Sequence, residues 1–472
     1  MRKTKMIGFT TPVRTSRARH MLSLLAAAAA ATVGHGAAVA APLHDAIGAP
    51  ENFKLKGTHR SRLEAIDGQF RPTGPESDAM WSMRTQIFAE YDAGPIRLGA
   101  EVIDARAYFQ KDNSTAGTSE INPVELSQAY LAIDLDDSGA GSKGALTLGR
   151  FTMSAGSKRL IDSYGSSNRV SAFTGANLDW RSAEGDRLLA FWAMPHLREP
   201  SDAESLRDNE IEWDDETTDL QFYGASFTKA KLLGGSLELY GYGLHERDSA
   251  EVQTMNRRIF TPGGRFARTP ANGRFDYEFE GAYQLGKIRA SRAAADVTDL
   301  DVSAWFAHAE VGRTLSGAWS PRVSVHFDQA SGDKANPNSY NRFDALFGAR
   351  RTDFGPVSLY GPVSRANLVS GGLRLDVAPS KRVDASIMGR ALWLNSATDS
   401  FGATGVRDAR GASGEYAGTQ IEGRVRYWIV PGAIRADAGA AWLNKGRFLK
   451  DAPNAPNTGD TAYAYLDLTL DF

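Results

Sequence analysis

Residues 461–472 read TAYAYLDLTLDF, and their side chains alternate between two kinds without interruption. Ala, Leu and Phe occupy the even positions, whereas Tyr, Thr and Asp occupy the odd ones. Because successive side chains of a β-strand point to opposite faces, this period of two predicts a strand with one apolar and one polar face. A helix would need apolar residues at spacings of three and four, which this segment lacks.

The same period of two recurs between residues 59 and 472. It is clearest at 275–286, 322–330, 382–392 and 420–429, where polar and apolar residues again lie on opposite faces. We recognise eighteen segments of this kind in the sequence. Most have the roughly 9–11 residues that a tilted strand needs to cross a membrane.

The connections between these segments alternate in length along the chain. Odd-numbered connections are long and even-numbered ones are short, with a single tie. Such alternation indicates an up-and-down sheet with loops at one end and turns at the other, as in bacterial outer-membrane barrels. A soluble β-sandwich, the alternative fold, has no reason to sort its connections in this way. The sequence therefore predicts an all-β fold, a transmembrane up-and-down antiparallel β-barrel of about 18 strands, wide enough for an aqueous lumen.

The composition excludes several other classes of protein. Hydrophobic residues make up 42% of the 472 residues and charged residues 23%, which excludes a disordered polymer. A mean hydropathy of -0.35 excludes a bundle of membrane helices. The absence of Cys excludes disulfide scaffolds, thiolate metal sites and Cys nucleophiles.

The N-terminus has the features of a secretory signal peptide. A basic region without acids precedes an Ala-rich apolar run over 21–33, and the small residues AVA at 38–40 offer a cleavage site. Removing 1–40 takes away six basic residues and no acidic one, so the formal net charge falls from -2 to -8, which argues against a nucleic-acid binder. We therefore predict three parts: a signal peptide cleaved near Ala40 (1–40), a short lead-in (41–58) and the barrel (59–472).

Several stretches of the mature chain resemble the alginate export family of outer-membrane barrels. They are RSRLE at 60–64, ELSQAYL at 125–131, LTLGR at 146–150, GSKRL at 156–160, DYEFEGAYQ at 276–284, SGD at 331–333, RFDALFG at 342–348 and SRANL at 364–368. The resemblance covers nearly the whole mature chain in this order. It implies an eighteen-stranded barrel and a route for an acidic polysaccharide, an alginate-like polyuronate, across the outer membrane. The family is broad, and we expect many members to carry something other than alginate.

The resemblance and the chain end also indicate partners and location. The last strand ends in the C-terminal aromatic Phe472, which resembles the assembly signal that outer-membrane barrels present to the barrel assembly machinery. We expect the bacterial cell outer membrane as the location, outer-membrane lipid and an anionic polysaccharide as partners, and periplasmic export machinery upstream. No nucleic acid, cofactor or metal is expected.

The lumen of such a barrel is built from the polar faces of its strands. A guanidinium group is permanently charged and binds carboxylates bidentately, so arginines on these faces would attract a polyuronate and repel cations. The arginines that we assign to the lumen are Arg62, Arg84, Arg374, Arg390, Arg424 and Arg435. The carboxylates that could orient or screen them are Asp104, Glu280 and Asp376. The alternative is that these groups only pair with one another and brace the wall.

Three further arginines have assignments that depend on local structure. Arg106 and Asp104 share the parity of apolar Leu98, so a bulge near residues 102–103 is needed to turn them into the lumen. Arg150 shares the parity of Leu148, but the family resemblance favours a lumen or loop role, which requires a bulge or strand end. Arg159 lies in a long loop that could fold inward.

The long connections carry other charged groups, for each of which two roles are possible. Lys334, Arg342, Arg350 and Arg351 lie in the longest connection, which could form a constriction or lid or could be a solvated outer loop. The acidic segment 202–219 could bind divalent cations through oxygen ligands, although such runs are more often only solvated.

Patterns typical of enzymes do not fit their context in this sequence. GAGSKG at 139–144 has the spacing of a dinucleotide-binding fingerprint, but it joins two predicted strands and no helix follows it. The main hypothesis is therefore a channel for an anionic polysaccharide or its oligomers. The alternatives are a general or anion-preferring porin for small solutes and, in another class, a barrel enzyme that uses Ser or His in the lumen.

Overall fold

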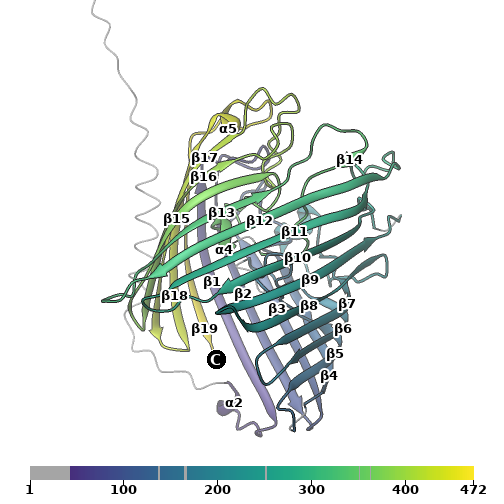
Figure 1. Ribbon diagram of the computed structural model, residues 1–472, viewed down its shortest axis with the longest axis vertical. Helices are drawn as coiled ribbons and strands as arrows, with labels where there is room; N and C mark the ends of the chain where they lie inside the picture. The colour runs from purple at the N-terminus through teal and green to yellow at the C-terminus, as the bar shows by residue number, and fades with distance from the viewer. Residues whose placement is uncertain (1–42, 137–138, 164–166, 250–251, 350, 362) are drawn as a thin grey trace, which may run out of the picture. The chain divides into compact units, whose positions relative to one another are not determined.

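The computed structural model describes residues 43–472 except 137–138, 164–166, 250–251, 350 and 362 (Figure 1). The predicted signal peptide and its cleavage near Ala40 lie outside the described residues. The described strands form one 19-stranded sheet, in which β14 has only two residues. Among the described residues, no helix is long and apolar enough to cross a membrane.

Eighteen long strands carry the architecture. The first nine are β1 (Phe53–Asp67), β2 (Ser77–Asp92), β3 (Ile96–Tyr108), β4 (Asn122–Asp134), β5 (Lys143–Phe151), β6 (Phe173–Arg181), β7 (Arg187–Pro195), β8 (Leu220–Leu232) and β9 (Gly235–Glu246). The others are β10 (Arg258–Arg268), β11 (Phe275–Ile288), β12 (Leu300–Thr314), β13 (Arg322–Ala330), β15 (Leu368–Ser380), β16 (Val383–Trp393), β17 (Tyr416–Val430), β18 (Ile434–Lys445) and β19 (Thr461–Asp471). The short elements are α2 (Leu43–Ala46), α3 (Ala203–Asp208), β14 (Ser339–Tyr340), α4 (Arg351–Phe354) and α5 (Arg447–Asp451).

The sheet closes on itself as an antiparallel barrel. Each long strand pairs with its neighbours in the chain, and β1 pairs with both β2 and β19. The short strand β14 runs parallel to β12 outside this series, so β13 pairs directly with β15 (Figure 1). The predicted all-β, up-and-down barrel of about 18 strands is confirmed.

The seam of the barrel is closed by the last residue of the chain. The backbone N–H of Gly57 donates to the carbonyl of Phe472 at 2.7 Å, and the N–H of Phe472 donates back at 2.9 Å. The Phe472 ring lies over Gly57 so closely that a Cβ added there would be 2.1 Å from the ring. A side chain at position 57 would therefore displace the Phe472 ring from its present place.

The first strand begins earlier than the sequence analysis predicts. β1 starts at Phe53, whereas the barrel was expected from residue 59, so the lead-in expected at 41–58 ends before Phe53 and contains α2. The reason is that FKLK at 53–56 already alternates, with both lysines on the inward face. There, Lys54 Nζ lies 2.7 Å from the carboxylate of Glu90.

The two ends of the barrel differ in the length of their connections. The shortest long connection, 68–76, is longer than the longest short one, 135–142, so the tie in the sequence prediction disappears. We call the end with the long connections the loop end and the other the turn end. Strand β1 runs from the turn end to the loop end, and the chain finishes with β19 at the turn end.

The strands are apolar outside and polar inside, because the register keeps the period of two in phase around the barrel. Outward side chains such as Leu373, Ile387 and Val425 are more than half exposed, as expected of a lipid-facing surface. The aromatic residues Tyr91, Trp305, Trp393, Tyr427 and Trp442 are also exposed on this face. The inward face carries charged residues such as Arg62, Glu280 and Arg390, which are buried.

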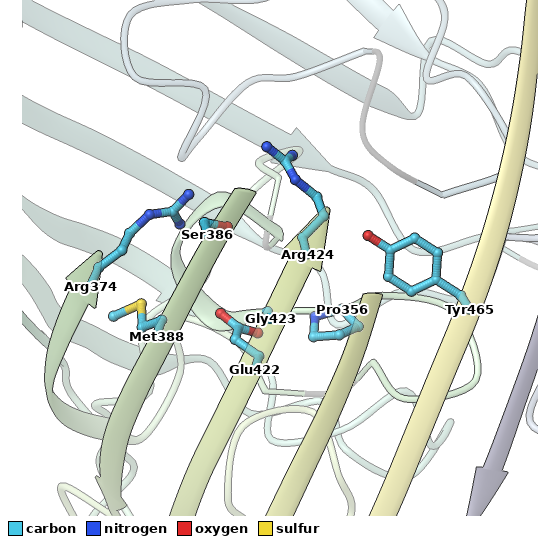
Figure 2. Close-up of a pocket in the computed structure, with 9 residues that line it drawn as sticks. Pro356, Arg374, Ser386, Met388, Glu422, Gly423, Arg424 and Tyr465 are labelled. Atoms are coloured by element: carbon cyan, nitrogen blue, oxygen red, sulfur yellow. The ribbon is translucent and has the colours of Figure 1, made fainter. Parts of the chain in front are cut away.

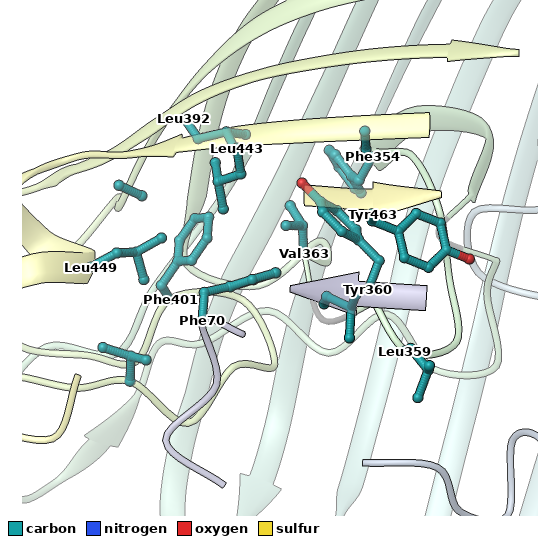
Figure 3. Close-up of a cluster of buried hydrophobic side chains, with 14 of the residues drawn as sticks. Phe70, Phe354, Leu359, Tyr360, Val363, Leu392, Phe401, Leu443, Leu449 and Tyr463 are labelled. Carbon is teal, nitrogen blue, oxygen red and sulfur yellow. The ribbon is translucent and has the colours of Figure 1, made fainter. Parts of the chain in front are cut away.

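The long connections fill part of the interior at the loop end. Phe354, Tyr360 and Val363 of the connection 331–367 pack with Phe401 of the connection 394–415 and with inward-facing strand residues such as Leu443 (Figure 3). These side chains are almost fully buried. The connections are therefore folded into the barrel as packed structures, and they narrow the space left for a solute.

Candidate functional site: the barrel lumen

One transverse row of the inner wall is built from arginines. The strand register pairs Arg435 of β18 with Thr469 of β19, Thr469 with Arg60 of β1, and Arg60 with Arg84 of β2. The row contains three guanidinium groups and no carboxylate. Residues paired across strands share a face, so all four side chains point into the lumen.

The side chains of this arginine row contact the loop 152–172. Arg60 Nη2 donates to the carbonyl of Ser167 and to Asn168 Oδ1, both at 3.0 Å. Arg84 Nη1 lies 3.4 Å from the same Ser167 carbonyl. The Arg435 guanidinium lies 5.4 Å from the Trp428 ring and donates weakly to Thr469 Oγ1 at 3.4 Å. The loop therefore reaches the middle of the wall, where the arginines hold it.

Arg62 lies one inward position closer to the loop end and has a different environment. Its side chain is 1% exposed and donates to Tyr463 Oη at 2.6 Å. It lies 3.6 Å from Glu64 and 3.5 Å from Asp467, and its guanidinium stacks 4.3 Å from the centre of the Tyr465 ring. This arginine is enclosed by acids and aromatic rings.

A polar cavity of about 70 Å³ lies beside these residues (Figure 2). Arg374 of β15 and Arg424 of β17 border it, with Met388 and Glu422 between them and Tyr465 on the far side. Figure 2 shows these side chains projecting from adjacent strands into the same space. The cavity therefore presents two guanidinium groups and one carboxylate.

Both arginines of this cavity are held by carboxylates. Arg374 Nε and Nη2 contact Asp376 at 2.9 and 2.8 Å, a bidentate pair within one strand. Arg424 Nη2 donates to Asp384 at 3.0 Å. Bidentate pairing fixes the direction of the guanidinium and lowers its net attraction for a solute.

Arg390 of β16 is only partly satisfied by its neighbours. It is 3% exposed, lies 3.3 Å from Glu422 and contacts the sulfur of Met388 at 2.7 Å. Its Nε and Nη1 atoms are buried without a hydrogen-bond partner. Its guanidinium also lies 5.9 Å from the ring of Phe354, which belongs to the inward-folded connection 331–367.

The strands β11 to β13 form an acidic part of the wall, and Arg159 neutralises it. Arg159 comes from the loop 152–172 and contacts Glu278, Glu280 at 2.8 Å and Asp353 at 2.9 Å. Asp353 belongs to the connection 331–367 and also pairs with Arg365 of that connection. The expected inward folding of the Arg159 loop is therefore what the contacts show, and this arginine ties both inward-folded loops to the wall.

Ser, His and Glu side chains meet in the same region. Ser324 Oγ lies 2.9 Å from His326 Nε2, and His326 Nδ1 lies 3.4 Å from Glu310. The hydroxyl of Ser324 is also bonded by Arg322 Nη1 at 3.2 Å, and Ser324 is only 1% exposed. A nucleophile needs access to its substrate, so this arrangement braces the wall.

The lumen assignment of Asp104 and Arg106 is wrong. The pairing of β3 with β2 runs without a shift from Tyr108 to Arg97, and the irregularities near residues 102–105 arise from extra residues in β4. The alternation of β3 is therefore unbroken, and both side chains lie on the outward face with Leu98. They form an ion pair of 2.8 Å there.

Arg150 lies at a strand end, as a loop role required. It is the penultimate residue of β5, and its Nη1 contacts Glu125 at 2.6 Å while its Nη2 contacts Glu216 at 2.7 Å. Glu216 belongs to the connection 196–219. Arg150 thus links a bulged part of β4 to an outer loop and is not part of the arginine row.

Sequence reasoning missed several residues of the lumen. Arg60 shares the parity of Arg62, so the alternation could have found it. Glu422 could have been found in the same way, from its parity with Arg424. Asp353 and Arg365 had no such signal, because only the folded loop brings them beside Arg159.

The predicted acidic segment 202–219 forms part of an ordered outer connection. Asp202 caps α3 by accepting from the N–H groups of Glu204 and Ser205. Asp214 accepts from Asn122 and from the Glu199 N–H, and burial raises the pKa of Asp214 to about 6. Among the residues that the structure describes, no group of three or more side chains is arranged to hold a metal ion.

The sequence was compared with known families and proteins. A family model described as alginate export matches residues 52–462, nearly the whole chain. No curated protein matches the chain.

Solved outer-membrane barrels share the fold at low sequence identity. OccAB1 of Acinetobacter baumannii matches with a TM-score of 0.58 and 12% identity, over 89% of this chain and 97% of that one. OpdQ of Pseudomonas aeruginosa matches with a TM-score of 0.56 and 13% identity, over 89% and 98%. OccK2 (OpdF) of Pseudomonas aeruginosa, solved in complex with glucuronate, matches with a TM-score of 0.55 and 12% identity, over 89% and 97%. Family and fold together identify a porin-like barrel channel of the bacterial outer membrane.

Proposed function

Because the chain belongs to the alginate export family, we propose that it passes an anionic polysaccharide, an alginate-like polyuronate, or its oligomers through an arginine-lined lumen. A polyuronate carries one carboxylate on each sugar unit. Guanidinium groups bind carboxylates with charge-assisted hydrogen bonds, so a wall with several of them offers several binding sites along the polymer. Each site must stay weak, so that the polymer keeps moving.

The observation that carries this proposal is the arginine row of Arg435, Arg60 and Arg84. The register places the three residues in one row across neighbouring strands of the inner wall, and no acid shares that row. Nearby arginines are paired with carboxylates, which moderates their attraction for an anion. A wall in which some arginines share their row with no acid and others are paired with carboxylates supports a route that attracts a polyanion without trapping it.

Block of the channel by a polyuronate tests the proposal. The purified barrel is recorded in a planar lipid bilayer, and a polyuronate or a polycation of similar length is added. We expect the polyuronate, and not the polycation, to block the current at low concentration. Arg84→Gln and Arg435→Gln should each weaken the block by about tenfold, the effect of losing one charge-assisted hydrogen bond.

Arg106→Gln is the matched control, because it removes the same charge from the outward face. The block should stay unchanged in this variant. Equal insensitivity to polyanion and polycation would contradict the proposed substrate class. An equal loss in Arg106→Gln and Arg84→Gln would contradict the role of the arginine row.

An anion-preferring porin for small solutes is the second candidate. The inward-folded loops favour it, because Arg159 and Asp353 join them across part of the interior and narrow the route. The fold relative OccK2 was solved with the single sugar acid glucuronate. Under this candidate, glucuronate would permeate liposomes that contain the barrel, while a long polyuronate would neither enter nor block.

We also propose that the barrel works without a catalytic step and depends on other proteins for assembly and supply. The buried Ser324 hydroxyl supports the first point. The apolar strand that ends in Phe472 supports recognition by the barrel assembly machinery, and the family supports periplasmic export machinery upstream. Co-purification of crosslinked periplasmic proteins with the barrel tests the last of these partners.

A further inference from the structure

A second cavity, of about 290 Å³, lies among the long connections. Its walls come from the connections 109–121, 152–172, 196–219 and 331–367. This volume is at the lower end of the roughly 300–1,000 Å³ that is usual for small-ligand pockets. The cavity is therefore large enough for about one sugar unit, and it is separate from the cavity between Arg374 and Arg424.

Arg198 of the connection 196–219 lines this cavity. It is half-buried, and within the described chain its guanidinium makes no hydrogen bond and no ion pair. Burial lowers the pKa of Arg198 to about 10, although Asp214 and Glu120 partly oppose this effect from a distance. A cation that is partly removed from water without a partner is costly, and an anionic ligand would relieve that cost.

The other charged groups around the cavity leave room for an anion. Arg169 lines the cavity and donates to Ser171 Oγ at 2.8 Å. Asp162 is engaged by Ser154 at 2.8 Å and by Lys158 at 3.5 Å. Glu120 accepts from the Gly117 N–H, and burial raises the pKa of Glu120.

Serine hydroxyls supply the uncharged part of the wall. Ser119, Ser163, Ser167, Ser171 and Ser358 line the cavity. Ser163 and Ser358 are already donors, to the Met153 carbonyl and to Glu64. A lining of hydroxyls with a guanidinium group matches the chemistry of a uronate, which has several hydroxyls and one carboxylate.

We propose that this cavity is a uronate subsite in which Arg198, assisted by Arg169, binds the carboxylate and the serines bind sugar hydroxyls. The inference rests on the proposed function and adds a second binding site for the polymer, separate from the arginine row. A polymer that passes the row would meet this subsite among the loops. Arg198 is then a specificity-determining residue that lies outside the strand wall.

Block by a short uronate tests the subsite. A uronate tetrasaccharide is added to the loop side of the barrel in a bilayer, and a neutral glucose tetrasaccharide is added in a parallel recording. We expect Arg198→Gln to weaken uronate block by about tenfold while the reversal potential in a salt gradient stays that of the parent. The matched control is Arg207→Gln in the same connection, whose side chain is 44% exposed and lies 3.9 Å from Asp112.

The outcomes separate the subsite from the proposed function. Loss of block in Arg198→Gln with retention in Arg207→Gln supports the subsite. Unchanged block in Arg198→Gln, or equal loss in both variants, overturns the subsite while the proposed function stands. Failure of the tetrasaccharide and of the polyuronate to block the parent barrel overturns both. A heat-dependent gel shift establishes that each variant is folded.

Discussion

At the scale of single residues, the inward-facing arginines divide by their surroundings. Arg62 and Arg159 are enclosed by carboxylates and aromatic rings, so their main effect is on the stability of the wall and loops. Within the part of the chain that the structure describes, Arg435 has only a weak contact to Thr469 and the ring of Trp428 beneath it. The same residue type thus braces the wall at one position and remains available to a solute at another.

Arg62→Ala should destabilise the barrel strongly. Removing this guanidinium leaves Glu64 buried and takes away a partner of Asp467, and breaking a buried ion pair costs roughly 3–5 kcal/mol. We expect a clear fall in the denaturant midpoint of unfolding in detergent. Arg435→Ala is the comparison, with an expected loss of about 1 kcal/mol or less. Equal losses would contradict the division of roles.

The odd or even position of a residue in its strand shows which face of the barrel wall it lies on. The sequence does not show which residues its side chain contacts. Arg374, Arg390 and Arg424 face inward as their alternation predicts. Asp104 and Arg106 were misassigned because the predicted bulge in β3 is absent and the bulges lie in β4 instead. The alternation of polar and apolar residues in β4 gives no sign of them. Arg198 carries no periodic signal at all, because its place depends on four loops that meet in space.

At the scale of elements, the two inward-folded connections are joined by one ionic cluster. Arg159 connects the loop 152–172 to the wall and to Asp353 of the connection 331–367. The apolar cluster of Figure 3 anchors the second connection independently. The two loops therefore depend on Arg159 to different degrees.

Arg159→Gln should loosen the loop 152–172 and widen the route. Three carboxylates would lose their shared cation and repel one another, which frees the loop from the acidic wall. We expect a larger mean conductance with more frequent brief closures in single-channel recordings. Lys158→Gln, which changes a half-exposed neighbour, is the control. A smaller conductance in Arg159→Gln would contradict the role of Arg159 in holding the loop 152–172 to the wall.

The outer connection 196–219 should respond to pH through Asp214. The pKa of about 6 lies above the ordinary value of 3.8, so the folded loop binds the proton more tightly than the open loop does. The stabilisation is complete below about pH 4 and is lost as the pH rises through 6. Glu125 faces the same carboxyl group and adds to this effect.

Hydrogen exchange measures this effect directly. After correction for intrinsic rates, residues 199–215 should be protected about tenfold more at pH 5 than at pH 7.5, which corresponds to ~1.4 kcal/mol. Asp214→Asn should abolish the difference. Equal pH dependence in the parent and the variant would assign the effect to another group.

The strands were predictable because one physical rule governs each of them. Lipid outside and water inside impose a period of two on every spanning segment, so the sequence carries the signal eighteen times over. β11 and β19 have nearly their predicted bounds, whereas β1 extends to Phe53 through FKLK. The loops obey no such rule, and their inward folding emerges only from contacts between distant segments.

At the scale of the whole molecule, closure depends on the fit between the two ends of the sheet. The ring of Phe472 covers Gly57, and the backbones of the two residues exchange hydrogen bonds. A free sheet edge in lipid would leave backbone groups without partners, so this seam is essential to the barrel.

Gly57→Val should impair assembly. The new side chain would displace the Phe472 ring, which a Cβ alone would approach to 2.1 Å. We expect a smaller fraction of heat-shifted, folded barrel on gels of outer-membrane fractions. Gly371→Val is the control, because a Cβ at this strand glycine meets nothing within 4 Å. Equal folding of both variants would contradict the role of the seam.

The proposed transport depends on the barrel holding a water-filled route whose wall favours anions. We propose that the arginine row and the paired arginines beside it supply that preference, whereas the -8 charge of the predicted mature chain is spread over other surfaces as well. The reversal potential reports the sign of the charge that the route itself selects.

The most direct test is the reversal potential of the purified barrel in a potassium chloride gradient. We predict a potential whose sign shows chloride to be more permeant than potassium, and a shift toward zero in the triple variant Arg60→Gln, Arg84→Gln, Arg435→Gln. A potassium-selective potential in the parent barrel, or an unchanged potential in the triple variant, would contradict the account.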